Sequence, residues 1–174
     1  LRILSEPKVA IAVLCALVSY AVMSLMMTAA PLAIVFCGFS TEEAALGIQW
    51  HVLAMYGPSF FTGTLITRFG AERITGGGLL LLAAAAAMAL AGVELANFWL
   101  ALVLLGVGWN FGFIGATSML TAVQRPEEKA RLQAANDFLV FGSVALASFS
   151  SGTLFATLGW EAINWVILPV VAGT

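Results

Sequence analysis

The stretch Gly63-Thr64-Leu65-Ile66-Thr67-Arg68-Phe69-Gly70-Ala71-Glu72-Arg73 is a short charged segment between two long apolar runs. The run before it, residues 44–66, contains no charged side chain, and neither does the run after it, residues 74–91. Either run is long enough to cross a bilayer, because about 20 apolar residues form a membrane-spanning helix. The stretch is therefore predicted to be a tight loop at a membrane surface. Gly70 would permit the reversal and Gly63 a close approach of helices.

The composition of the chain excludes most soluble protein classes. Of its 174 residues 61% are hydrophobic and 9% are charged, whereas soluble domains average about 25% charged residues. No basic patch supports nucleic-acid binding, no Cys/His spacing suggests a metal site, and no phosphate-binding loop or other cofactor motif is present. The chain is predicted to be an all-α integral membrane protein.

The apolar runs predict six membrane spans. Their approximate bounds are 9–36, 44–67, 74–95, 98–123, 130–158 and 165–174, the last one cut short. Pro31 and Pro58 should bend the first and second spans. Ser40 or Thr41 should cap the second span, with Glu43 in its first turn. Because Leu1 is not a start methionine and the last run stops short, we expect the chain to be a piece of a longer protein.

Lysines and arginines are confined to alternate loops. The seven basic residues are Arg2, Lys8, Arg68, Arg73, Arg125, Lys129 and Arg131. They lie in the lead before the first span, between the second and third spans, and between the fourth and fifth. The remaining loops carry only acidic residues, namely Glu42, Glu43, Glu94 and Glu161. Since cytoplasmic loops are enriched in basic residues, the start of the chain is predicted to be cytoplasmic, in what we expect to be a bacterial inner membrane.

The pattern Gly-x-Leu-x-x-Arg-x-Gly-x-x-Arg, from Gly63 through Arg68 and Gly70 to Arg73, resembles the loop signature of the major facilitator superfamily of transporters. The alternative interpretation is an ordinary basic loop of a membrane protein. Thr67 stands where the usual signature has an acidic residue, which favours the degenerate copy found in the C-terminal half of such carriers. Six spans with this loop after the second resemble one half of a twelve-helix carrier.

The resemblance implies a function and a partner. It implies secondary active transport of a small organic solute by alternating access, driven by protons, in the direction of efflux or uptake. The partner would be the missing N-terminal six-helix half of the same protein. The first, second, fourth and fifth spans would face a central cavity, and the third and sixth would lie outside. The alternative is a membrane-embedded scaffold, or a channel-like half without transport activity of its own.

Polar side chains recur at helical spacing on three of the spans. The predicted substrate-binding residues are Ser24, Thr28, Gln49, Tyr56, Asn110 and Thr117, with Met27 and Phe113 as an apolar wall. Polar groups at that depth need water, a ligand or one another. Asn110 is the strongest candidate for a substrate contact. Its alternative role is a hydrogen bond between helices with no ligand.

Asp137 and His51 are candidates for proton coupling. Asp137 is the one carboxylate placed inside a predicted span, where an ionisable group is costly unless it is paired or hydrated. Its alternative role is a structural ion pair with Arg68 or Arg131. His51, the single histidine, is able to titrate near neutral pH. Its alternative role is that of a neutral histidine hydrogen-bonded between helices.

An enzyme is not expected: residues 149–152 read Phe-Ser-Ser-Gly and lack the first glycine of a serine-protease motif.

The topology is testable by single-cysteine labelling. In a variant without Cys15 and Cys37, a cysteine at position 68 should react with a membrane-impermeant reagent only from the cytoplasmic side, and one at position 94 only from outside. Labelling of position 68 from the outer side would reverse the orientation.

Overall fold

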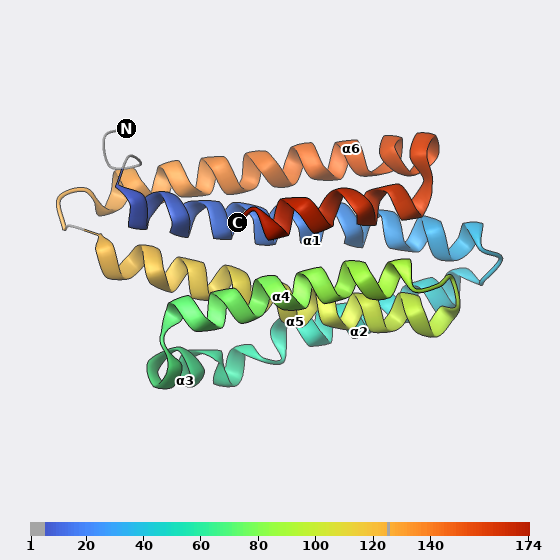
Figure 1. Cartoon of the computed structure of the whole chain (residues 1–174), viewed down its shortest axis with the longest axis horizontal. Helices are drawn as coiled ribbons and strands as arrows, with labels where there is room; N and C mark the ends of the chain where they lie inside the picture. The colour runs from blue at the N-terminus through green and yellow to red at the C-terminus, as the bar shows by residue number, and fades with distance from the viewer. Residues whose placement is uncertain (1–5, 125) are drawn as a thin grey trace.

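The computed structural model of the chain describes residues 6–124 and 126–174. Arg2 and Arg125 therefore lie outside the described residues. The described residues form an elongated bundle of helices (Figure 1). The helices are α1 (Pro7–Phe36), α2 (Thr41–Tyr56), α3 (Ser59–Phe69), α4 (Ala71–Leu90), α5 (Leu95–Val123) and α6 (Lys129–Ala172).

The start of α2 is fixed by its own first residues. The Ser40 hydroxyl accepts a hydrogen bond from the Glu43 backbone N–H, and the Glu43 carboxylate accepts one from the Ser40 N–H at 2.8 Å. This reciprocal pair satisfies two of the backbone donors that a helix N-terminus leaves free. The predicted cap is confirmed, and Ser40 is the capping residue.

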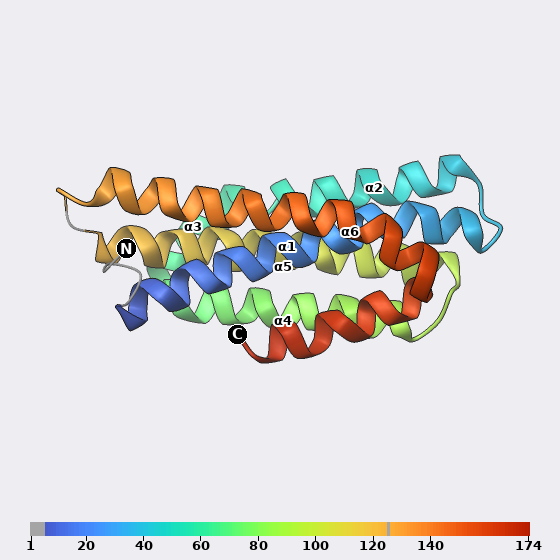
Figure 2. The same ribbon diagram turned by 90° about the horizontal axis from the view of Figure 1, so that it is seen from above.

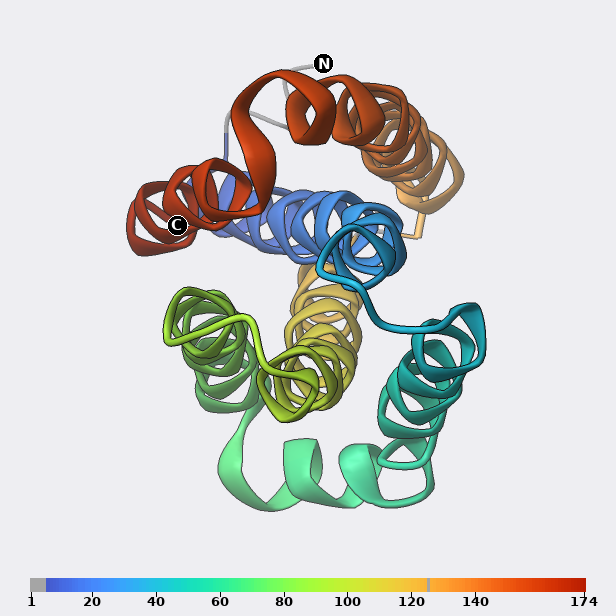
Figure 3. The same ribbon diagram turned by 90° about the vertical axis from the view of Figure 1, so that its right-hand side faces the viewer.

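The second predicted span, 44–67, is two helices rather than one. α2 ends at Tyr56 and α3 begins at Ser59, because Pro58 lacks the N–H that a continuous helix needs at that point. The predicted effect of Pro58 is confirmed and is a full break. Figure 3 shows that α3 turns away from the direction of α2.

The charged loop reverses the chain at Gly70. Its φ of 90° and ψ of 147° end α3 and start α4, and this conformation is available to glycine without steric cost. The expected role of Gly70 is confirmed. A Cβ placed on Gly63 would meet no described atom within 4 Å, so the expected close helix approach at Gly63 is not present within the described residues.

α6 runs the length of the bundle and then folds back on itself (Figures 1 and 2). The reversal occurs at Gly159, whose φ is 79°. We call residues 129–158 the first arm of α6 and residues 160–172 the second arm. The predicted outer turn of 159–164 is too long, because the helix resumes directly at Trp160, where the buried indole N–H donates to the Ala89 carbonyl at 3.2 Å.

Among the described residues, α1, α4, α5 and α6 are long and apolar enough to cross a membrane. α2 and α3 have 16 and 11 residues, too few for either to span alone. The predicted end of the third span is also wrong: α4 stops at Leu90 and α5 starts at Leu95. The fold class is thus confirmed as all-α with several apolar helices of membrane-spanning length.

α1 and α5 lie side by side in the middle of the bundle (Figure 3). α4 and the second arm of α6 lie on one side of this pair, and α2 and the first arm of α6 lie on the other (Figures 2 and 3). We call this second side, with α1 and α5 behind it, the α2–α6 face. The start of α1, the end of α5 and the α3–α4 loop share one end of the bundle, whereas the α1–α2 loop, the α4–α5 loop and the reversal of α6 share the other (Figure 1).

Glycines on α5 bring three neighbouring helices close to its backbone. A Cβ on Gly106 would lie 2.6 Å from the His51 carbonyl oxygen of α2, and one on Gly108 would lie 2.9 Å from the Leu82 nitrogen of α4. A Cβ on Gly112 would collide with the Ser19 hydroxyl of α1. α1, α2 and α4 therefore pack closely against α5, the kind of approach that a Gly-x-x-x-Gly pair such as Gly108 and Gly112 permits.

Substitution of Gly78 would test the close contact between α4 and α5. A Cβ on Gly78 would lie 2.7 Å from the Gly112 Cα, whereas one on Gly77, the next residue of the same helix, would meet no described atom within 4 Å. Gly78→Ala should lower the apparent melting temperature of the purified protein in detergent, since overpacking costs about 1–3 kcal/mol. Gly77→Ala is the control and should leave that temperature unchanged or raise it. Equal melting temperatures for the two variants would contradict the packing.

Candidate functional site

Five aromatic rings form a continuous cluster across the α2–α6 face. We call this set the aromatic cluster: Tyr20, Tyr56, Trp109, Phe113 and Phe141. Its members come from α1, α2, α5 and the first arm of α6, so the cluster joins all four helices of that face.

Tyr20 is at the centre of the cluster. Its ring meets Trp109 and Phe113 edge-on, with centroids 5.3 and 5.0 Å away, and contacts Phe141 at 6.0 Å. Trp109 and Phe113, one turn apart on α5, are stacked at 5.3 Å with planes 14° apart. Tyr56 reaches the Trp109 ring at 6.0 Å. Such offset and edge-to-face pairs are the favourable geometries for aromatic side chains.

The cluster is buried at its centre and exposed at its two ends. Trp109 is 6% exposed, whereas Tyr56 and Phe141 are each 57% exposed. The buried Trp109 Nε1–H has no hydrogen-bond partner among the described residues. A buried donor without an acceptor is unusual, because leaving it unpaired costs about 1–3 kcal/mol. The arrangement is able to hold a flat apolar group against its exposed rings and to donate one hydrogen bond.

Asn110, next to Trp109, is fully buried and hydrogen-bonded within the protein. Its Nδ2 donates to the Met55 carbonyl at 2.8 Å and to Ser59 Oγ at 2.7 Å, and its Oδ1 accepts from Thr62 Oγ1 at 2.6 Å. These partners lie on both sides of the Pro58 break. The geometry favours the alternative role from the sequence, a bond between helices, because the amide already has partners from α2 and α3.

The other predicted substrate residues are not gathered at one point. Tyr56 and Phe113 belong to the aromatic cluster, joined through Trp109. Thr117 donates to the Phe113 carbonyl of its own helix. The remaining residues differ in burial: Ser24 is buried, Met27 is half-buried, and Thr28 and Gln49 are exposed. No hydrogen bond between these four residues occurs in the described part of the chain.

Asp137 is half-buried on the first arm of α6 and accepts two amide hydrogen bonds. Gln133 Nε2 lies 2.9 Å and Asn136 Nδ2 3.3 Å from its Oδ1. Across residues 6–124 and 126–174 its carboxylate forms no ion pair, so the expected pair with Arg68 or Arg131 is absent there. Asn136 Oδ1, also buried, lacks a partner in the same part of the chain.

His51 is fully buried between α2 and α5. Its Nδ1 lies 2.8 Å from the Leu102 carbonyl oxygen and must be the protonated nitrogen, since a carbonyl only accepts. Its Nε2 has no partner among the described residues. This geometry is that of a neutral imidazole joining two helices, the alternative that the sequence left open.

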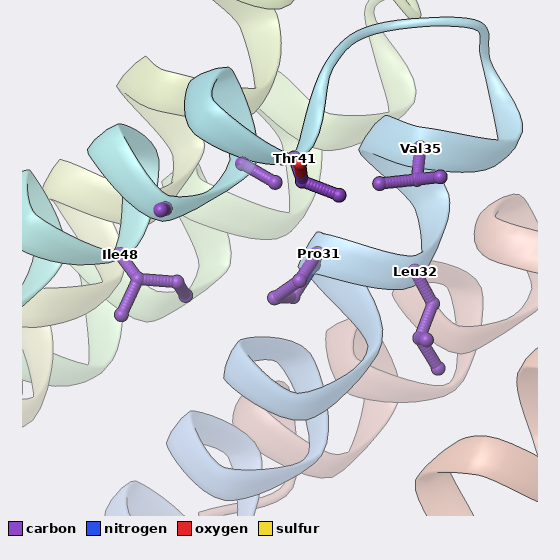
Figure 4. Close-up of a pocket in the computed structure, with 7 residues that line it drawn as sticks. Pro31, Leu32, Val35, Thr41 and Ile48 are labelled. Carbon is purple, nitrogen blue, oxygen red and sulfur yellow. The ribbon is translucent and has the colours of Figure 1, made fainter.

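Two further features lie apart from the cluster. An apolar hollow of about 400 Å³ separates the end of α1 from the start of α2 (Figure 4). The residues that line it include Pro31, Val35, Thr41 and Ile48, and none of the predicted substrate residues is among them.

In the loop signature, Arg68 is exposed and its guanidinium lies 5.3 Å from the Phe69 ring centroid.

Three members of the cluster were not predicted from the sequence: Tyr20, Trp109 and Phe141. Tyr20 begins the same four-residue polar stripe as Ser24 and Thr28, and Trp109 stands four residues before Phe113, a spacing that places side chains on one helix face. These signals were present, but nothing in the sequence connects Tyr20 to rings on two other helices.

Asn110→Ala should destabilise the protein rather than only weaken binding. The substitution removes the amide that donates to the Met55 carbonyl, and a buried unpaired group costs about 1–3 kcal/mol. It also removes the Thr62 bond to Asn110, although the Thr62 hydroxyl keeps the Pro58 carbonyl as acceptor. The apparent melting temperature in detergent should fall. Asn97→Ala, on the same helix, is the control, because its amide contacts a Met88 thioether at 3.6 Å. An unchanged melting temperature together with weaker solute binding would restore Asn110 as a substrate contact.

Comparison with known proteins identifies relatives but no family model and no solved structure. The chain is 56% identical over 171 residues to the riboflavin transporter RfnT of Brucella anthropi, with 98% of this chain and 43% of that protein covered. It is 34% and 31% identical to two uncharacterised MFS-type transporters of Bacillus subtilis, YddS and YdeG. In both, 86% of this chain is matched, against 36% and 37% of the relative.

The chain thus spans about two fifths of the length of the relatives it matches. All three are transporters and none is named as an enzyme, in agreement with the expectation from the sequence. Their names and the four long apolar helices indicate an integral membrane protein. The chain is therefore similar over 86% of its length to transporters of the MFS type, and it matches a part of each of them.

Proposed function

We propose that this chain is the C-terminal six-helix half of a secondary transporter that moves a small organic solute by alternating access. Six passes are obtained when α2 and α3 together count as the second pass and the two arms of α6 as the fifth and sixth. The Thr67 form of the loop signature supports assignment to the C-terminal half. The other half of the transporter is the partner, as the coverage of about two fifths of each relative suggests.

The observation that carries this proposal is the composition of the α2–α6 face. It brings together α1, α2, α5 and the first arm of α6, while α4 and the second arm of α6 lie on the other side (Figure 3). These four helices are the first, second, fourth and fifth passes, which the family resemblance assigns to the central cavity. Large apolar side chains are exposed on helices of this face, for example Phe141 and Tyr56. The partner half and the solute would cover them.

We further propose that the solute is riboflavin or a closely related flavin. The support is the relative named a riboflavin transporter, which is 56% identical over 98% of this chain. The direction of transport, efflux or uptake, is a matter for measurement.

Proton coupling is assigned in this proposal to Asp137. Its carboxylate is half-buried, accepts hydrogen bonds from two amides and forms no ion pair within the described residues. A carboxylate in a membrane span without a cationic partner is a candidate functional group. His51 is the second candidate, although its imidazole is engaged between α2 and α5. The proposed location is a bacterial inner membrane, with the basic loops on the cytoplasmic side as the positive-inside rule favours.

The proposed function is tested by a transport assay with the full-length carrier, expressed in cells that cannot synthesise riboflavin. Cells expressing it should take up or expel radiolabelled riboflavin at a rate that rises with the proton gradient. Asp137→Asn should abolish the dependence on that gradient while protein abundance stays normal. Glu72→Gln is the control, since Glu72 is exposed at the first turn of α4. It should behave as the wild type.

Three outcomes would contradict parts of this proposal. No movement of riboflavin in either direction, at normal abundance, would remove the substrate. Movement that only follows the riboflavin gradient would support the channel-like alternative. Unaltered dependence on the proton gradient in Asp137→Asn would remove Asp137 from coupling.

A further inference from the structure

We propose that the aromatic cluster binds the planar heteroaromatic ring of the transported solute, with Trp109 Nε1–H as the hydrogen-bond donor to that ring. This inference rests on the proposed function and deepens it, because it names the part of the solute that this half recognises and the residues that recognise it.

The first support is the position of the rings. The cluster draws one or more side chains from each of the four helices on the α2–α6 face, and its exposed ends, Tyr56 and Phe141, belong to α2 and α6. Tyr20 connects the two ends, because its ring contacts Phe141 directly and contacts Tyr56 through Trp109. A flat ring laid against Tyr56 and Phe141 therefore contacts helices on both edges of the face. Aromatic pairs of this kind contribute about 0.5–1.5 kcal/mol each beyond the area they bury.

The second support is independent of the rings. The Trp109 Nε1–H is buried, and no acceptor is found for it in the described part of the chain. The adjacent Asn110 has partners for its amide from α2 and α3, so the local packing is able to satisfy polar groups on this helix. An unpaired donor inside an aromatic cluster is explained if a ligand supplies the acceptor. Carbonyl oxygens and ring nitrogens of a heteroaromatic ring are suitable acceptors.

The chemistry of the cluster defines the class of ring. Its five side chains carry no charge at neutral pH, and their polar groups are two phenol hydroxyls and one indole N–H. Such a surface favours a neutral, flat ring with acceptor atoms at its edge over an anion or an aliphatic chain. Tyr56 is 57% exposed and its ring lies 6.0 Å from that of Trp109, so a solute ring would approach Trp109 from the Tyr56 end of the cluster.

Binding to the purified full-length carrier in detergent tests this site. The probes are riboflavin, whose fluorescence is quenched on stacking, and two of its parts: lumichrome, the ring without the side chain, and ribitol, the side chain without the ring. Lumichrome should bind and should compete with riboflavin, whereas ribitol should not compete.

Two substitutions separate the two interactions. Phe141→Leu removes an exposed ring, and Trp109→Phe keeps a ring but removes the N–H. Each should weaken lumichrome binding about three- to tenfold, the range expected for one aromatic contact or one hydrogen bond. Phe60→Leu is the control, because Phe60 is 94% exposed on α3 and is not a member of the cluster. It should leave binding unchanged.

The melting temperature of every variant is measured alongside. Phe141 is exposed, so its variant reports on binding even if Trp109→Phe lowers stability. Unchanged lumichrome binding in both cluster variants would overturn the ring site while riboflavin transport stood. Ribitol competing as well as lumichrome would also overturn it. Lumichrome binding that depends on the cluster, in a carrier that moves no riboflavin, would keep the site and reject the proposed substrate.

Discussion

The arrangement of the bundle depends on how closely α5 is approached by its neighbours. In a bilayer the hydrophobic effect does not drive helices together, because lipid tails are as apolar as the side chains that meet them. Association then relies on packing and hydrogen bonds. Gly106, Gly108 and Gly112 leave α5 without side chains where α2, α4 and α1 reach it. Each contact brings a neighbouring backbone or a small side chain to the surface of α5. These close contacts set where the aromatic rings and side-chain amides of the neighbouring helices lie.

Two adjacent residues of α5 illustrate how one helix serves both packing and binding. Successive side chains on a helix point about 100° apart, so Asn110 and Trp109 face different neighbours. Asn110 meets the break between α2 and α3 and hydrogen-bonds across it, where Pro58 interrupts the regular backbone bonding. Trp109 meets Tyr20 and Tyr56 instead. The first residue completes the fold, and the second leaves a donor unpaired in the aromatic cluster.

Local features of the fold were predictable from the sequence, and contacts between distant segments were not. Ser40 and Pro58 act on residues within four positions, and Gly70 needs only its own φ, so their effects followed from the residue types. The gap predicted between the spans 130–158 and 165–174 contains the reversal at Gly159, but the helix resumes sooner than composition indicated. The partners of Asn110 lie 48 and 55 residues away, and Tyr20 and Trp109 are similarly remote in sequence. Within an apolar helix, periodicity does not distinguish a face toward lipid, a neighbouring helix or a solute.

The turn at Gly159 has a mechanical consequence. Since a single residue joins the two arms of α6, the ends of the arms that meet at Gly159 stay together whatever the tilt of either arm. The first arm carries Phe141 on the α2–α6 face, and the second arm is tied to α4 through the Trp160 bond to the Ala89 carbonyl. The aromatic cluster and the α4 side of the bundle are therefore connected through one helix that changes direction at one residue.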